Sequence, residues 1–247
     1  MEHYPIPYAI CRVWLEEVFA STGLHWQISP LGEWQITDAS GMLLATITPP
    51  LLFQNQNILH WEHLPTHPPN TLILLLEAGG TAGLAYLEEG AMVQHKIIRR
   101  YTVRKKQGKA QLNHLKTRGK SKAGSRVRLA ETILFFEDIN QKLLEWEVAP
   151  QASQIWYSAT PPVWHRLFQA KAAPPFTVQD PRLHKIPLDL PTPTLEVLGQ
   201  VSDFLLQTKL QIHRPQHLPT LSLLHTPALV QPGFQFDDSD TEGFDAD

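Results

Sequence analysis

The sequence has little cysteine and no long apolar run. Its 247 residues include a single cysteine, Cys11, which excludes a disulfide framework and a structural zinc site built mainly on thiolates. The longest apolar run, 71–76, is far shorter than the roughly 20 residues that cross a bilayer. No secretory signal precedes the first proline-rich residues. We therefore expect a cytoplasmic globular protein without a membrane partner.

Acidic residues are missing between Lys96 and Arg128. This stretch holds 13 of the 21 Lys and Arg residues and none of the 24 Asp and Glu residues, so the rest of the chain, with eight basic residues, carries −16. The overall charge of −3 therefore hides a bipolar chain. A dense basic stretch on an acidic protein is typical of a polyanion site, because neutralising phosphates releases counterions. A solvated basic loop is the alternative, but the density of the run favours nucleic acid or the ribosome.

Periodicity and composition divide the chain into three parts. We interpret 1–65 as a small N-terminal α+β cap, with helical periodicity over 8–21. A proline-rich joint at 64–69 follows the cap. In 70–230 strands interleave with helices, which predicts an α/β domain with a mixed central sheet flanked by helices. The acidic tail 231–247 is expected to be disordered. The cap also contains three strand-like runs, at 25–29, 33–38 and 42–48.

Individual elements of the α/β domain follow from their patterns. The continuously apolar run 71–77 predicts a buried central strand, and Gly79-Gly80 supply the turn into the next strand. The other elements are predicted as strands at 83–88, 93–104 and 155–158, an edge strand at 175–178, and helices at 125–148, 162–170 and 194–210.

The hydrophobic periodicity disappears over 105–124, where we expect a mobile basic loop. Gly108 permits a sharp turn, and Gln111 places a neutral amide near the tip. Such an amide can orient a hydroxyl group or water among phosphates that would repel a carboxylate. Gly124 leads into a helix whose N-terminus favours a phosphate. Tyr101 fits RNA contact and core packing equally well. The candidate RNA-binding residues are Tyr101, Arg104, Lys105, Lys106, Lys109, Lys120, Lys122, Arg126 and Arg128.

Residues 96–128 resemble the release-factor-like domain of a known family. The family is that of the valosin-containing-protein-associated mitochondrial stress-responsive proteins, also called ankyrin-repeat and zinc-finger peptidyl-tRNA hydrolases. Its pattern is a Tyr-x-Val-Arg strand, then Lys-x-Gly-x-x-Gln, then Ser-x-Ala-Gly-x-x-x-Arg leading into a helix. The matching residues are Tyr101, Val103 and Arg104, then Lys106, Gly108 and Gln111, then Ser121, Ala123, Gly124 and Arg128.

The resemblance implies a fold and an activity. The fold would be similar to the central domain of eukaryotic and archaeal class-one release factors. The activity would be cleavage of peptidyl-tRNA on stalled ribosomes or large ribosomal subunits, which releases the nascent chain in ribosome-associated quality control. Gln111 would be the catalytic residue, Gly108 would shape the loop, and Arg104 and Lys106 would hold the acceptor stem.

Two chemistries fit the same loop. As a nuclease near the CCA end, Gln111 would help to orient a ribose 2′-hydroxyl against a phosphate. As an ester hydrolase, it would position water against the peptidyl ester. Neither chemistry requires a metal or a cofactor. A non-catalytic factor that binds the ribosome or tRNA is the alternative function.

The chain also departs from the family pattern. The loop reads Gly-Lys-Ala-Gln where true release factors carry Gly-Gly-Gln, and the sequence shows no codon-reading domain, zinc finger or ankyrin period. It therefore resembles a reduced version of the family, of a kind expected in bacteria, and gives no indication of protein partners beyond the ribosome.

Two further sets of residues suggest a metal but favour a simpler interpretation. The histidines at 60, 63 and 67 are separated by prolines that interrupt any helix able to align their rings. Glu77 and Asp138 are candidates for a two-metal nuclease site, yet isolated acids of this kind are usually solvated or salt-bridged. We expect no metal at either set.

Overall fold

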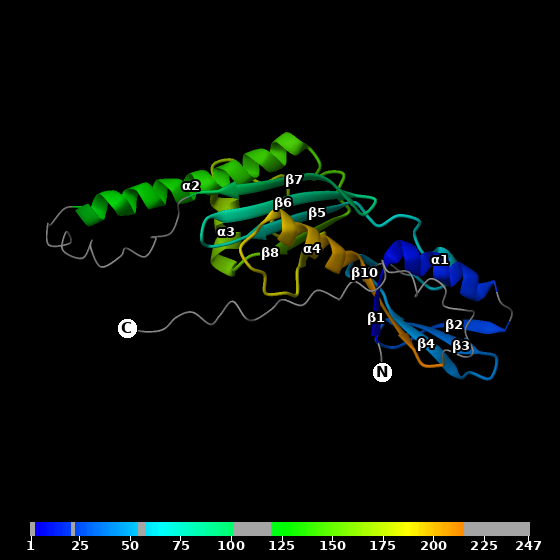
Figure 1. The fold of residues 1–247 in the computed structure, drawn as a ribbon. Helices are drawn as coiled ribbons and strands as arrows, with labels where there is room; N and C mark the ends of the chain where they lie inside the picture. Colours follow the sequence, from blue (N-terminus) through cyan, green and yellow to red (C-terminus); the bar gives the residue numbers. More distant parts are fainter. Residues whose placement is uncertain (1–2, 21–22, 54–57, 101–119, 215–247) are drawn as a thin grey trace, which may run out of the picture. The chain divides into compact units, whose positions relative to one another are not determined.

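The computed structural model describes residues 3–20, 23–53, 58–100 and 120–214 (Figure 1). The chain forms two compact units. Unit 1 combines residues up to His67 with residues from Asp203 onward, and unit 2 comprises Pro68–Ser202. The crossing from the first part of unit 1 into unit 2 falls within the proline-rich joint.

Unit 1 is a five-stranded antiparallel sheet with one helix packed on it. The sheet order is β1-β10-β4-β3-β2, and short 3₁₀ turns lie at Leu51–Phe53 and Trp61–His63. α1 buries Cys11, Trp14, Leu15 and Val18, in a core shared with Ile36 of the sheet. The predicted helix and three strands of the cap are confirmed. The elements are β1 (His3–Pro7), α1 (Tyr8–Phe19), β2 (Leu24–Ile28), β3 (Trp34–Asp38), β4 (Leu43–Thr48) and β10 (Gln207–Ile212).

The C-terminal end of the predicted α/β domain differs from the structure. The predicted helix over 194–210 is α4, which ends at Leu206, and the chain then forms β10, which lies between β1 and β4 of unit 1. Thr208 and Leu210 are fully buried whereas Lys209 is exposed, the period-two pattern of a half-buried strand. The predicted C-terminal boundary of the domain, residue 230, is therefore wrong: residues 203–214 belong to unit 1, and 215–230 lie outside the described residues.

Unit 2 is a mixed α/β domain, as predicted. Its sheet has the order β7-β6-β5-β8-β9. β5 and β8 are parallel, as are β8 and β9, whereas β6 runs antiparallel to both β5 and β7. All six residues of β5 are buried, which confirms it as a central strand. The elements are β5 (Thr71–Leu76), β6 (Thr81–Glu88), β7 (Ala91–Arg99), α2 (Lys120–Trp146), β8 (Gln154–Ser158), α3 (Pro161–Gln169), β9 (Leu183–Lys185) and α4 (Leu195–Leu206).

Helices cover both faces of the unit 2 sheet (Figure 1). Leu72, Leu74 and Leu76 of β5 pack in one core with α2 and α3, including Phe135 and Leu167. On the opposite face the sheet approaches α4 closely at Gly83. A Cβ atom at Gly83 would lie 3.2 Å from Pro193 Cβ and 3.3 Å from Leu198 Cγ. The absence of a side chain at this position therefore sets how closely α4 can pack.

Two boundaries in unit 2 differ from the predictions. α2 begins at Lys120, so the predicted loop over 105–124 is wrong from residue 120, and its remainder lies outside the described residues. The edge strand predicted at 175–178 is wrong, and β9 is the edge strand instead. Phe176 is buried in the core, with its ring 6.0 Å from that of Phe168, and a turn follows in which Asp180 donates its backbone N–H to the carbonyl of Thr177. No helix within the described ranges is long and apolar enough to span a membrane.

Candidate nucleic-acid interface

Four strands of unit 2 end at one edge of the sheet, which we call the carboxyl edge. β7 runs parallel to β5 because both are antiparallel to the intervening β6, and β8 and β9 share the direction of β5. Their last residues are Leu76, Arg99, Ser158 and Lys185. Ligand sites of open α/β sheets form beyond the carboxyl ends of parallel strands. Arg100 follows β7 at this edge, and the chain then continues into 101–119, which we call the basic segment and which contains Gln111.

A hydrogen-bonded turn after β5 contacts Arg100, the residue that precedes that segment. Glu77 donates its backbone N–H to Thr81 over 2.9 Å, and Gly80 donates its own to Glu77 over 3.2 Å. Gly80 has φ 88°, a conformation that favours glycine, which confirms the predicted glycine turn. The backbone N–H of Arg100 donates to Gly80 over 2.8 Å. The last described residue before the basic segment is thus fixed to the sheet.

The side chain of Arg100 fixes the same point to α2. Its Nε lies 2.6 Å from Oδ2 of Asp138 and its Nη2 lies 3.2 Å from Oδ1, a bidentate pair, while Nη1 lies 3.2 Å from Oε2 of Glu131. The hydrogen bonds that Arg100 donates to Asp138, and secondarily the one that it donates to Glu131, raise the pKa of Arg100. We call these three residues the Arg100 clamp. It joins the strand that precedes the basic segment to the helix that follows it.

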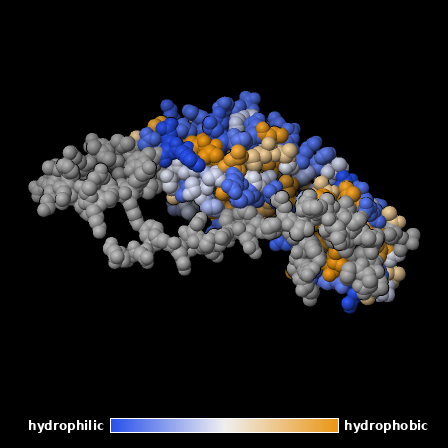
Figure 2. Space-filling view, in the orientation of Figure 1, coloured by the Kyte–Doolittle hydropathy of each residue, from blue (hydrophilic) through white to orange (hydrophobic). Residues whose placement is uncertain are grey.

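α2 reaches from the clamp toward the other end of the basic segment. Eleven residues separate Glu131 from Lys120, where the helix begins, which corresponds to about 16 Å at 1.5 Å per residue. The first turns of α2 extend past the end of the strands in Figure 1. The surface of unit 2 around α2 is largely hydrophilic in Figure 2, although Ile133, Leu134 and Leu144 are exposed.

The predicted site residues fall into two groups in the structure. Five of them occupy the first nine residues of α2 and are placed by its backbone, although their side chains are not among those described. The others lie in 101–119, outside the described residues, so their predicted roles stay predictions. The first group is Lys120, Lys122, Gly124, Arg126 and Arg128, and the second is Tyr101, Arg104, Lys105, Lys106, Gly108, Lys109 and Gln111.

The basic residues at the end of β7 are of two kinds. Lys96 and Arg99 are exposed, and neither forms a salt bridge with any side chain in the described ranges. Arg100 is only partly exposed and is neutralised by two carboxylates. Lys96 and Arg99 can therefore meet phosphates, whereas Arg100 has a structural role. Asp138 is salt-bridged, as predicted for an isolated acid.

The histidines of unit 1 form contacts of their own. His60 caps the turn at Trp61–His63 by accepting the backbone N–H of Glu62, and its ring centroid lies 6.2 Å from that of His63. Among the described residues, no group of three or more His, Cys, Asp or Glu side chains is arranged to hold a metal ion.

Sequence reasoning missed the Arg100 clamp and a cavity beside it. The clamp joins residues 31 and 38 positions apart, so no local pattern reveals it. A usable signal was present, because Arg100 follows directly on β7 and two acids sit seven residues apart, a helix-face spacing, in the predicted helix. For the cavity the signal was weaker: Ala159 and Thr160 follow directly on the predicted strand 155–158, but β9 was not predicted.

Comparison with known families decides the relationship of the chain. A family model described as the Bacteroidetes VLRF1 release factor matches residues 71–213, which is more than half of the chain and includes the basic segment. The chain belongs to this VLRF1 release factor family. The matched region begins with β5 and contains all of the carboxyl edge and the Arg100 clamp.

Similarity to individual proteins is more limited. The VLRF1 chain is 30% identical over 155 residues to a mouse protein named tRNA endonuclease ANKZF1, which covers 62% of this chain and 20% of the mouse protein. The human protein of the same name is 29% identical over 143 residues, covering 57% of this chain and 20% of that protein. The matched regions thus span about a fifth of the length of these relatives.

A solved structure named the Vms1 mitochondrial localization core is also similar. It is 14% identical, the match covers 86% of each chain, and the TM-score is 0.44. This TM-score is too low to support an argument for a shared fold.

Proposed function

We propose that this VLRF1 chain cleaves peptidyl-tRNA on stalled ribosomes or large ribosomal subunits and thereby releases the nascent chain. The observation that carries the proposal is the basic, acid-free stretch around Gln111, which falls within the family match. The relatives named tRNA endonuclease support a reaction on tRNA. We also propose a cytoplasmic location and a unit 2 fold similar to the central domain of class-one release factors.

The described residues suggest how the chain presents the reactive segment. The Arg100 clamp and the Gly80 hydrogen bond fix its first end, and α2 begins directly after its second end. Fixing both flanks lowers the entropic cost of orienting a reactive group between them. The exposed Lys96 and Arg99 add positive charge where the segment leaves the sheet, which favours a polyanionic substrate.

Gln111 would act as the catalytic residue by orienting a nucleophile. Its amide has both a donor and an acceptor, so it can hold a ribose 2′-hydroxyl against the adjacent phosphate, or water against the peptidyl ester. In the first case the lysines and arginines of the segment would stabilise the charge that develops on the phosphoryl oxygens. We favour the nuclease chemistry because of the names of the relatives, and we propose that it proceeds without a metal.

The decisive experiment compares Gln111→Leu with the unchanged chain on purified stalled large-subunit complexes. We expect the variant to lose at least about 100-fold in the rate of nascent-chain release, within the usual range for a group that assists proton transfer or orientation, while it still binds the complexes. Gln107→Leu is the matched control, since it removes a neutral amide from the same segment at a variable position of the family pattern. Equal release by both variants would reject catalysis and leave a binding factor.

Two further measurements separate the chemistries. A tRNA shortened at its 3′ end would show phosphodiester cleavage, and an intact CCA end would show ester hydrolysis. Release that persists in a chelator such as EDTA supports a metal-independent reaction, whereas release that stops in EDTA and returns with a divalent cation would reject it.

A further inference from the structure

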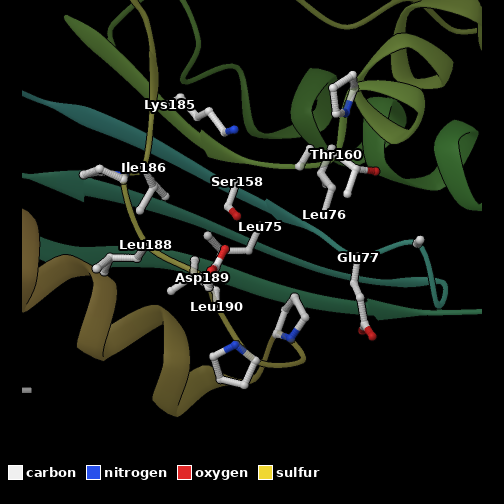
Figure 3. A pocket seen from close by; sticks show the side chains of 16 residues that line it. Leu75, Leu76, Glu77, Ser158, Thr160, Lys185, Ile186, Leu188, Asp189 and Leu190 are labelled. Carbon is white, nitrogen blue, oxygen red and sulfur yellow. The ribbon is translucent and has the colours of Figure 1, made fainter. Parts of the chain in front are cut away.

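A cavity of about 730 Å³ opens at the carboxyl edge of unit 2 (Figure 3). Its walls come from the ends of β5, β8 and β9 and from the proline-rich chain that follows β9. The buried Leu75, Leu76 and Ile186 contribute an apolar floor, and Pro187 and Pro191 extend the apolar wall. The cavity adjoins the turn that holds Arg100, since Glu77 and Ala78 belong to both.

Three polar side chains converge on this cavity. Ser158 is the last residue of β8, Lys185 is the last residue of β9, and Asp189 follows four residues later. Figure 3 shows the Ser158 hydroxyl and the Asp189 carboxylate near the centre of the view and the Lys185 ammonium reaching toward the same space. The carboxylate of Glu77 points away from this group.

Lys185 and Asp189 have no salt-bridge partner, among the described residues, that would give them a structural role. Neither Lys185 nor Asp189 forms a salt bridge with any side chain in the described parts of the chain, and both residues are exposed at the rim. By contrast, Asp180 and Arg182 of the same unit are paired with each other at 2.7 Å. A few convergent polar groups over an apolar floor are the usual features of a small-molecule site.

The arrangement of charge limits the ligand. α3 opens with two prolines, Pro161 and Pro162, which have no N–H to offer a phosphate, so Lys185 is the cation that the cavity provides. A single cation suits a single phosphate. A continuous nucleic-acid backbone would bring further phosphates toward the carboxylates of Asp189 and Glu77.

The remaining groups suit the other parts of a nucleotide. A carboxylate beyond the end of a parallel strand is a common acceptor for ribose hydroxyls, which assigns Asp189, assisted by Ser158, to a vicinal diol. The leucines, Ile186 and the prolines offer an apolar surface for the face of a base. The volume lies within the range of 300–1,000 Å³ typical of ligand sites.

We propose that this cavity binds a single nucleotide, with its phosphate at Lys185, its ribose diol at Asp189 and Ser158, and its base on the apolar floor. The residues assigned to the nucleotide lie outside 101–119, and occupancy of the site does not require any cleavage reaction. Two sources share this chemistry: a free nucleoside monophosphate, and the 3′-terminal nucleotide of an RNA, which has one phosphate and a free diol.

Isothermal titration of the full chain with AMP tests the proposal. We expect saturable binding that weakens at least about tenfold when 2′-deoxy-AMP replaces AMP and in Asp189→Asn, because each loses a hydrogen bond to a charged group. Lys185→Gln should weaken AMP binding by a similar factor but leave the affinity for adenosine unchanged. Lys171→Gln is the matched control, since Lys171 is an exposed lysine of unit 2 outside the cavity.

A competition experiment then distinguishes the two sources. A short RNA ending in CCA with a free 3′ diol should displace AMP if the natural ligand is an RNA end, and the same RNA with a 3′-phosphate should not. Failure of both RNAs to displace AMP assigns the site to free nucleotides. No saturation by AMP at millimolar concentration, or equal affinity for AMP and 2′-deoxy-AMP, would overturn the proposal. Gln111→Leu should bind AMP normally, so this result is independent of the proposed cleavage.

Discussion

The two sheets of this chain have the same number of strands but different strand directions. Neighbouring strands in the unit 1 sheet are all antiparallel, so successive strands end at opposite edges. In unit 2, four of the five strands end at the carboxyl edge. Because these four strands share one direction, the loops that follow them, with their unpaired backbone groups and varied side chains, lie together at one edge of unit 2. Most of the family match, 71–202 of 71–213, and the residues of both proposed sites belong to that unit.

The units also differ in how their polar groups are stabilised. In unit 1 the groups with strongly shifted pKa values, Tyr8 and Cys11, are shifted mainly by burial. In unit 2 burial shifts the pKa values of Tyr86 and His184 as well, but those of Arg100, Asp180 and Arg182 are shifted mainly by hydrogen bonds to an opposite charge. Among the described residues, ion pairs that shift a pKa value in this way are thus a feature of unit 2.

The largest expected effect comes from breaking unit 1 through its C-terminal strand. Leu210 is fully buried in the unit 1 core, so Leu210→Asp places a carboxylate among apolar side chains and should cost more than about 3 kcal/mol of unfolding free energy. Hydrogen exchange followed by mass spectrometry should show lost protection in β4 and β10. Protection in β5 and β8 should persist.

The neighbouring residue supplies the control for this test. Lys209 is exposed on the same strand, and Lys209→Asp should leave exchange within the range of an ordinary surface substitution, about 0.5 kcal/mol. Equal loss of protection in both units after Leu210→Asp would show that they do not unfold separately, contrary to the division at residues 67 and 203.

A smaller effect is expected from the Arg100 clamp in unit 2. Arg100→Lys keeps the charge but removes the bidentate geometry with Asp138. All three side chains of the clamp are about 30% exposed, so solvent screening limits the expected loss to about 1 kcal/mol of unfolding free energy. If the clamp positions the basic segment, kcat for nascent-chain release should fall by about tenfold while KM changes little.

Arg99→Gln is the matched control for the clamp. This exposed arginine of β7 lies outside the clamp, so its loss should weaken the salt dependence of RNA binding and leave thermal stability unchanged. A clamp variant that lowers stability without changing kcat would restrict Arg100 to a purely structural role.

The smallest effect is a difference between the units in pH response. Burial raises the pKa of the Cys11 thiol from 9.0 to about 12 and also raises that of Tyr8. Because the pKa is higher in the folded state, burying the uncharged thiol contributes stability that is fully present below pH 9 and is lost as the pH rises toward 12. On alkaline titration unit 1 should therefore lose exchange protection first.

Unit 2 should respond to acid in the opposite sense. The hydrogen bond from Arg182 lowers the pKa of Asp180 below its usual 3.8, so this stabilisation is present above that value and is lost as the pH falls below about 4. Burial lowers the pKa of His184 as well, which adds a loss below about pH 6.5. Asp180→Asn should make the stability of unit 2 less dependent on pH below 4. An acid response that is stronger in unit 1 would contradict this assignment.

Elements with a strong local pattern were predictable from the sequence. The apolar run of β5, the glycine turn after it and the helical periodicity of α1 each correspond to an observed element, because local spacing alone determines which face is buried. The separation of basic and acidic residues along the chain is likewise visible in the sequence alone. These features identified the fold class and the basic segment.

The errors arose where tertiary pairing decides the conformation. Residues 207–210 continue the apolar spacing of α4, but pairing with β1 and β4 turns them into a strand. β9 has three residues and is defined by its pairing with β8 rather than by a pattern of its own. The Arg100 clamp and the cavity could not be predicted for the same reason, because the sheet brings together residues that are far apart in the sequence.

The position of β10 has a consequence for the order in which the chain folds during synthesis. β1 and β4 are separated by β10, so the first 67 residues emerge from the ribosome without the strand that joins them. Every residue of unit 2 has been made by Ser202, before β10 exists. The middle of the chain can thus adopt its structure first, whereas unit 1 is completed only by a strand made about 140 residues later. At the usual rates of protein synthesis this corresponds to a delay of seconds.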